Sequence, residues 1–176
     1  MTAGTINNYT QKHKNDDDYA DDIMVSVFNE YKDYITGRPT TRGGVYHVDM
    51  LPTTCHVYFG DVMIASPNGR LAHIPLSEGI SPEKGADING PTAVVKSCSK
   101  MNHCETGGTL LNQKFTPAAI AGEKGIDNLA ALIRSYFAMN GHHMQFNVID
   151  RQTLIEAQKN PEEYKELIVR VAGYSD

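Results

Sequence analysis

The sequence predicts an α/β fold in which helices and strands alternate, as they do in an α/β layer or barrel. After Gly125, segments with helical periodicity alternate with short apolar segments that are typical of strands. Before that point the chain is rich in loops, because residues 37–125 hold 12 of the 15 glycines and seven of the eight prolines. Long ordered loops in a compact domain more often line a functional site than merely connect elements.

Length and composition exclude several classes of protein. The 176 residues, 40% of them hydrophobic, suffice for one domain with a core, which argues against a wholly disordered chain. The formal net charge of −5 leaves no basic surface, so we expect no nucleic-acid partner. No apolar run approaches the ~20 residues that span a bilayer, and the N-terminus lacks a secretory signal, so we expect a cytoplasmic protein without membrane contact. Three cysteines, an odd count, argue against a disulfide framework.

The N-terminal part contains one predicted helix. The stretch up to Asn15 is polar and aperiodic, which indicates a loop or a frayed end. The run from Asp16 to Asp18 can cap a helix and complement its dipole, and this helix should end before Gly37. Its apolar residues recur at spacings that place them on one helical face, namely Ile23, Met24, Val27, Phe28 and Tyr31.

The loop-rich middle contains two short predicted strands and two predicted turns. Short apolar runs predict strands over 45–50 and 56–59. Asn-Gly pairs in the sequences PNGR (67–70) and INGP (88–91) predict turns.

The last third of the chain has the clearest regular pattern. Helical spacing, capping residues and apolar runs alternate there, which favours helices separated by strands. In chain order we expect a helix over 126–137 closed by Asn140 and Gly141, a strand over 143–149, a helix from Asp150 to about Lys159, a short helix from Asn160-Pro161, and a strand over 167–171.

Two groups of residues that include Cys104 could carry out chemistry. Cys98, His103 and Cys104 offer three soft ligands within seven residues, but their spacing matches no standard zinc pair and a fourth ligand is missing. Buried cysteines and a hydrogen-bonded histidine are therefore favoured over a metal site. Cys104 beside Glu105 resembles a nucleophile with an acid partner, yet adjacent residues on a strand face opposite ways.

Paired histidines and paired glycines also have structural explanations. His142 and His143 precede a predicted strand, where structural hydrogen bonding is favoured over acid–base catalysis or ligation. Gly107 and Gly108 lack the spacing of a phosphate-binding loop, which favours a tight turn.

Small polar groups gather after Pro52 in the sequence Thr53-Thr54-Cys55-His56. This segment is compatible with contact to a small polar ligand and equally with a capped turn. Gly173 follows a predicted strand, where a glycine is usually a turn residue with positive φ and by itself indicates no chemistry.

The C-terminal tail carries the most informative motif. The sequence IVRVAGY, from Ile168 to Tyr174, resembles the signature around the radical glycine of glycyl radical enzymes, the pyruvate formate-lyase superfamily. One position departs from the commonest pattern, because Asp176 stands where a small residue is frequent. The resemblance extends over nearly the whole chain through the motifs NDDDYADDIM, TGRPT, GGVYHVDMLPTTCHVYFG, ASPNGR, LSEGISPEKGAD, NGPTAVVKSCSKM, GGTLLNQKF, GEKGIDN, GHHMQFNV and VRVAGYSD.

The resemblance implies a more specific fold than the α/β pattern alone. The family fold is a ten-stranded β/α barrel made of two half-barrels, and this chain resembles its C-terminal part, loop-rich and ending at the glycyl radical loop. Residues 1–36 would be an N-terminal loop and helix that belong to an upstream catalytic domain. Residues 37–176 would be the second half-barrel and the glycine radical region, truncated after Asp176.

The resemblance also implies an activity. The chain is similar in particular to the dehydratases that eliminate water from trans-4-hydroxy-L-proline to give 1-pyrroline-5-carboxylate, and Thr53, with Thr54 as a weaker candidate, matches a position that binds this small-molecule substrate. Glycerol or diol dehydratases, choline trimethylamine-lyases and formate acetyltransferases are the alternatives. Two further alternatives are a free-standing spare part that carries the radical, and a truncated product without catalytic activity.

Cofactor and partners follow from the same resemblance. A glycyl radical would be stored on Gly173, placed there by a radical SAM activating enzyme that uses S-adenosylmethionine and an iron–sulfur cluster, with no metal or cofactor bound to this chain. The full-length protein would form a homodimer. The family's thiyl cysteine and its acid partner lie on a Gly-Cys-x-Glu loop, a context that none of Cys55, Cys98 and Cys104 has. We therefore expect the chain alone to be inactive.

Overall fold

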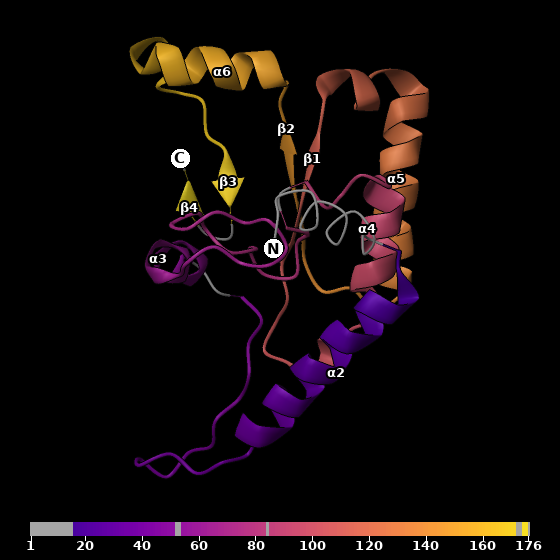
Figure 1. Ribbon diagram of the computed structural model, residues 1–176. Coiled ribbons are helices and arrows are strands. Elements are labelled where there is room, and N and C mark those ends of the chain that lie inside the picture. Colours follow the sequence, from indigo (N-terminus) through magenta and orange to yellow (C-terminus); the bar gives the residue numbers. More distant parts are fainter. Residues whose placement is uncertain (1–15, 52–53, 84, 172–173, 176) are drawn as a thin grey trace.

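The computed structural model describes residues 16–51, 54–83, 85–171 and 174–175 (Figure 1). Helices and strands alternate in its second half, as the sequence predicts. The α-helices are α2 (Asp18–Ile35), α3 (Cys55–Val62), α4 (Pro91–Cys98), α5 (Gly122–Ala138) and α6 (Arg151–Lys159). The strands are β1 (Leu111–Phe115), β2 (Met144–Val148), β3 (Arg170–Val171) and β4 (Tyr174–Ser175). Three short 3-10 helices are η1 (His103–Glu105), η2 (Pro117–Ile120) and η3 (Pro161–Tyr164).

A β-α-β unit organises the second half of the chain. β1 and β2 pair in parallel, from Leu111 opposite Met144 to Phe115 opposite Val148. α5 connects them, because parallel neighbours need a crossover rather than a hairpin. A third segment joins this sheet through an isolated parallel bridge between Met50 and Thr109. The α/β prediction is therefore confirmed.

The main apolar core lies between this sheet and the helices α4 and α5. One face of β1 supplies Leu111, which is fully buried together with Val95 of α4 and Tyr136 of α5. Figure 1 shows both helices on the same side of the β1–β2 pair. Because side chains alternate along a strand, Asn112 faces the opposite side of the sheet, where polar groups gather.

Helix α2 packs on the rest of the chain with a mixed face, on which Asp21 and Lys32 are buried beside Phe28. Asp17 caps it by accepting hydrogen bonds from two backbone amides, and the helix ends before Gly37, as predicted. Lys100 pairs with Asp21 at 2.9 Å, and Lys32 pairs with Glu105. Of the predicted apolar stripe only Phe28 is buried, and the exposed members are Ile23, Met24, Val27 and Tyr31.

The strand predicted over 56–59 is wrong, because these residues lie in helix α3. A run as short as His-Val-Tyr-Phe cannot distinguish a strand from a helix by periodicity. The helix is favoured by close packing on a distant segment: a Cβ at Gly60 would lie 2.5 Å from the Ile74 carbonyl oxygen and from Pro75 Cα. In addition, Leu76 N donates to His56 O at 3.0 Å.

Other predicted strands are shorter than expected or absent. The segment 45–50 forms bridges only at its ends, Val45 with Pro39 and Met50 with Thr109. Of the strand predicted over 167–171, only the last two residues pair, in β3. The strand over 143–149 is confirmed as β2, whereas β1 was not predicted.

Both Asn-Gly turns are confirmed. Gly69 has a φ of 101° and Gly90 a φ of 86°, and each donates its amide to the residue three positions before it. Arg70 follows the first turn and is buried. Its guanidinium donates to the carbonyl oxygens of Leu71, Ile74 and Ile64 at 2.7–3.1 Å, which fixes the loop after α3.

None of the helices that the structure describes is long and apolar enough to cross a lipid bilayer.

Candidate functional site

The segment that leads into α3 carries the predicted substrate-binding threonines. It is tied to the chain before β1, because Met50 N donates to Gly108 O at 2.9 Å and Gly107 N donates to Val48 O at 2.8 Å. Thr54 is the N-cap residue of α3 and is half-buried, and its hydroxyl makes no capping hydrogen bond. Thr53 lies outside the described residues.

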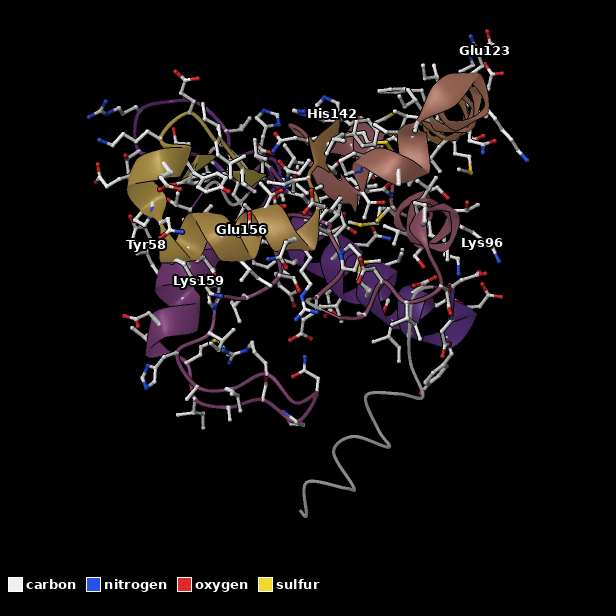
Figure 2. The ribbon with its side chains drawn as sticks, turned by 90° about the horizontal axis from the view of Figure 1, so that it is seen from above. Tyr58, Lys96, Glu123, His142, Glu156 and Lys159 are labelled. Atoms are coloured by element: carbon white, nitrogen blue, oxygen red, sulfur yellow. The ribbon has the colours of Figure 1, made fainter. Side chains whose placement is uncertain are left out.

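Thr109 contacts two histidines of this region through its side chain and its backbone. The Nδ1 atom of His103 lies 2.8 Å from Thr109 Oγ1, and the Nδ1 atom of His142 lies 3.3 Å from Thr109 O. Burial lowers the pKa of His103, which favours the neutral imidazole. The structural role predicted for His142 at the entrance to β2 is confirmed, and Figure 2 shows this residue beside the sheet.

Gly107 and Gly108 lead into the sheet, where their backbone groups bond to Val48 and Met50. Gly108 has a φ of 154°, and a Cβ there would lie 3.2 Å from Cε1 of His142. The close approach of the histidine ring is therefore a physical reason for glycine at this position.

The three cysteines lie on different elements and differ in exposure. Cys98 is buried, donates to Ile80 O at 3.2 Å, and has its pKa raised by burial to about 12. Cys55 begins α3 and Cys104 lies in η1, both exposed. Glu105 pairs with Lys32. In the described part of the chain, no three His, Cys, Asp or Glu side chains are grouped so that they could hold a metal ion.

The predicted radical glycine is bracketed by a small hairpin. β3 and β4 pair antiparallel, with Val171 opposite Tyr174 and Arg170 opposite Ser175. Gly173 itself lies between these strands and outside the described residues. Figures 1 and 2 show the hairpin and α3 on the same side of the β1–β2 pair.

A buried acidic residue, Glu78, was not singled out from the sequence. Its Oε2 accepts hydrogen bonds from Ser81 Oγ at 3.0 Å and from Nδ2 of Asn112 on β1. Ser81 Oγ in turn accepts from the backbone N–H of Asn112 at 2.9 Å. Burial is the main cause that raises the pKa of Glu78. The sequence around it, LSEGISP, does not indicate burial, because an acidic residue among turn residues is usually exposed.

The chain matches two families of protein over consecutive regions. Residues 76–176 match the family described as Glycine radical, and residues 4–60 match the family described as Pyruvate formate lyase-like. The chain belongs to the glycyl radical enzymes. The first match includes the β3–β4 hairpin and Gly173, so the family that the tail motif predicts is confirmed.

Relatives within the glycyl radical enzymes cover almost all of the chain. It is 67% identical over 171 residues to the trans-4-hydroxy-L-proline dehydratase of Clostridioides difficile, which covers 97% of this chain and 22% of that relative. The crystal structure of hydroxyproline dehydratase from the same organism, with trans-4-hydroxy-L-proline bound, matches with a TM-score of 0.93 and 64% identity over 99% of this chain and 23% of that one.

A glycerol dehydratase is also similar. The glycerol-bound, B12-independent enzyme from Clostridium butyricum matches with a TM-score of 0.85 and 47% identity, over 92% of this chain and 21% of that one. The chain therefore spans about a fifth of the length of the relatives that it matches.

Proposed function

We propose that this chain is the radical-bearing, C-terminal part of a glycyl radical dehydratase that acts on trans-4-hydroxy-L-proline. The observation that carries the proposal is the 67% identity over 171 residues to a trans-4-hydroxy-L-proline dehydratase. The glycerol dehydratase is only 47% identical, which favours the hydroxyproline substrate over glycerol. The sheet of β1 and β2 would belong to the ten-stranded barrel, and residues 1–36 to the upstream catalytic domain.

Gly173 would store the radical. Removal of one hydrogen from a glycine Cα leaves an electron that is delocalised over the adjacent amide and carbonyl groups. The absent side chain lets this centre become planar without steric strain. Pairing of β3 with β4 on either side of Ala172 and Gly173 would hold the loop in place. A radical SAM activating enzyme, with S-adenosylmethionine and an iron–sulfur cluster, would remove the hydrogen.

The substrate chemistry needs groups from the rest of the enzyme. An upstream cysteine, as a thiyl radical, would take a hydrogen atom from the ring carbon next to the nitrogen. The hydroxyl on the neighbouring carbon would then leave as water with a proton from a general acid, while the ring nitrogen would lose a proton and form the C=N bond. Return of the hydrogen atom to the carbon that lost the hydroxyl would give 1-pyrroline-5-carboxylate. Thr53, and less directly Thr54, would hydrogen-bond the substrate. Cys98 is unsuited to the thiyl role because it is the last residue of α4 and is buried in the core against α5 and β1.

The test is a chimera, since the chain spans only 22% of its relative. The matching segment of the Clostridioides difficile enzyme is replaced by this chain, and the protein is activated anaerobically. We expect a doublet in electron paramagnetic resonance, from coupling to the one remaining Cα hydrogen, and 1-pyrroline-5-carboxylate from trans-4-hydroxy-L-proline. The variant Gly173→Ala should lose both, whereas Gly44→Ala, at an exposed position, should keep both. The same doublet in Gly173→Ala, or turnover of glycerol instead of hydroxyproline, would contradict the proposal.

A further inference from the structure

Helix α3 has little apolar packing within the described chain. Its large side chains Val57, Tyr58, Phe59 and Val62 are exposed, and Figure 2 shows Tyr58 at the outer edge of the molecule. Among the described residues, several close contacts join the helix to the segment 73–76. Leu76 N donates to the carbonyl oxygen of His56 in the first turn, Gly60 rests on the backbone of Ile74 and Pro75, and Nδ1 of His73 lies 2.5 Å from the carbonyl oxygen of Asp61. The position of α3 therefore depends on the segment 73–76.

Two residues after this segment, Glu78 bonds to Asn112 of strand β1. The carboxylate accepts hydrogen bonds from Ser81 and from the side chain of Asn112, while Ser81 also accepts from the Asn112 backbone. These three residues close a small ring of hydrogen bonds on the polar face of β1. Ile80 N adds a bond to Leu110 O at 3.2 Å. Glu78 is 7% exposed, so solvent contributes little to holding it.

The ring of hydrogen bonds among Glu78, Ser81 and Asn112, called here the Glu78 clamp, is linked to Thr54, one of the predicted substrate-binding residues. Thr54 is the N-cap of α3 and lies two residues before His56, whose backbone receives the bond from Leu76. His56 is itself buried. A shift of the segment that contains Glu78 is therefore transmitted to the first turn of α3 through a single hydrogen bond and a short stretch of backbone.

Resting on the proposed function, we propose that Glu78 is a positioning residue for substrate: its hydrogen bonds to Ser81 and Asn112 fix the first turn of α3 and thereby Thr54, the N-cap residue of that helix and one of the proposed substrate-binding residues. Glu78 acts through these residues and does not touch the substrate. Its effect is on substrate binding rather than on the storage of the radical, because the contacts that carry it lead to α3.

The experiment uses the chimera with Glu78→Leu, Glu78→Gln and Ser81→Ala. Glu78→Leu removes the acceptor, and we expect KM for trans-4-hydroxy-L-proline to rise about tenfold, which corresponds to the loss of one hydrogen bond of about 1.4 kcal/mol. Glu78→Gln keeps an oxygen acceptor, so KM should stay within about twofold of the parent. The radical content, measured by electron paramagnetic resonance, should equal that of the parent in both.

Glu123→Leu is the matched control, and Ser81→Ala is a milder variant for the case in which Glu78→Leu does not fold. Glu123→Leu changes a glutamate at the outer end of α5, on the other side of the molecule from α3 (Figure 2), and should leave KM unchanged. If Glu78→Leu does not fold, Ser81→Ala removes the link to the backbone of β1 without a large cavity and should still raise KM by about threefold. An unchanged KM in the variants that fold, an equal rise in Glu78→Gln, or a loss of radical without a change of KM overturns the proposal.

A second readout separates this proposal from the proposed function. If the parent chimera forms no radical and does not consume hydroxyproline, the proposed function fails. Hydrogen exchange over residues 54–62 then decides the positioning role. Faster exchange in Glu78→Leu, but not in Glu78→Gln, supports it, whereas equal protection in both overturns it.

Discussion

Gly60→Ala tests whether packing or helix propensity controls α3. Gly60 lies inside the helix, where replacing glycine by alanine stabilises a protein by about 1 kcal/mol from propensity alone. Here the added Cβ would lie 2.5 Å from the Ile74 carbonyl oxygen and from Pro75 Cα, both of them backbone atoms. Overpacking of this kind costs about 1–3 kcal/mol, and the upper end applies because backbone yields less than a side chain. The net effect should be a local destabilisation of about 1–2 kcal/mol.

The measurement is hydrogen exchange of residues 55–63 in the chimera, followed by mass spectrometry. A destabilisation of about 1–2 kcal/mol makes local opening about 5–30 times more frequent, and exchange should accelerate by the same factor. Gly44→Ala is the control, since the nearest atom to its Cβ would be Thr40 Oγ1 at an ordinary 3.5 Å. Slower exchange in Gly60→Ala, as propensity alone predicts, would refute the packing argument.

Two further predictions concern other parts of the chain. Cys98 should resist alkylation by iodoacetamide at pH 8 in the folded chimera and react in urea, as measured by mass spectrometry, because burial raises its pKa to about 12 and only the thiolate reacts. Alkylation in the folded protein at the rate found in urea would contradict the burial of this thiol. Asp21→Asn should accelerate exchange over residues 18–35 about fivefold, a loss of about 1 kcal/mol, because Lys100 loses a nearly buried partner at 2.9 Å. The exposed neighbour Asp22→Asn should have no effect, and equal exchange in the two variants would show that the ion pair does not hold α2.

Local signals in the sequence predicted the elements whose causes are themselves local. The cap at Asp17, the end of α2 before Gly37 and the turns at Gly69 and Gly90 depend on the properties of a few adjacent residues. The strand β2 was also found, because its apolar run is bounded on both sides by residues that break a strand. The family followed from motifs spread along the chain, and the match over residues 76–176 confirms it.

Elements that depend on distant partners were missed. The residues of α3 are apolar in a pattern that fits either a helix or a strand, and the backbone of Ile74 and Pro75 favours the helix. The sequence of β1, LNQKF, has no alternation of apolar and polar residues, and its Asn112 is accommodated by a hydrogen bond to Glu78, which lies 34 residues earlier. The sequence indicated the candidate site through Thr53, with Thr54 as the weaker candidate, and through the tail motif, whereas the role of Glu78 followed only from its contacts.

The sequence by itself determined the helix caps, the turns and membership of the glycyl radical enzymes, because backbone preferences and motif residues are properties of the chain wherever it lies. The tertiary structure alone decided that α2 buries Asp21 and Lys32 beside Phe28 and that Glu78 is buried. The physical reason is that burial and ion pairing depend on which distant segments meet. The same glutamate is an ordinary surface charge or a buried acceptor according to whether Ser81 and Asn112 reach it.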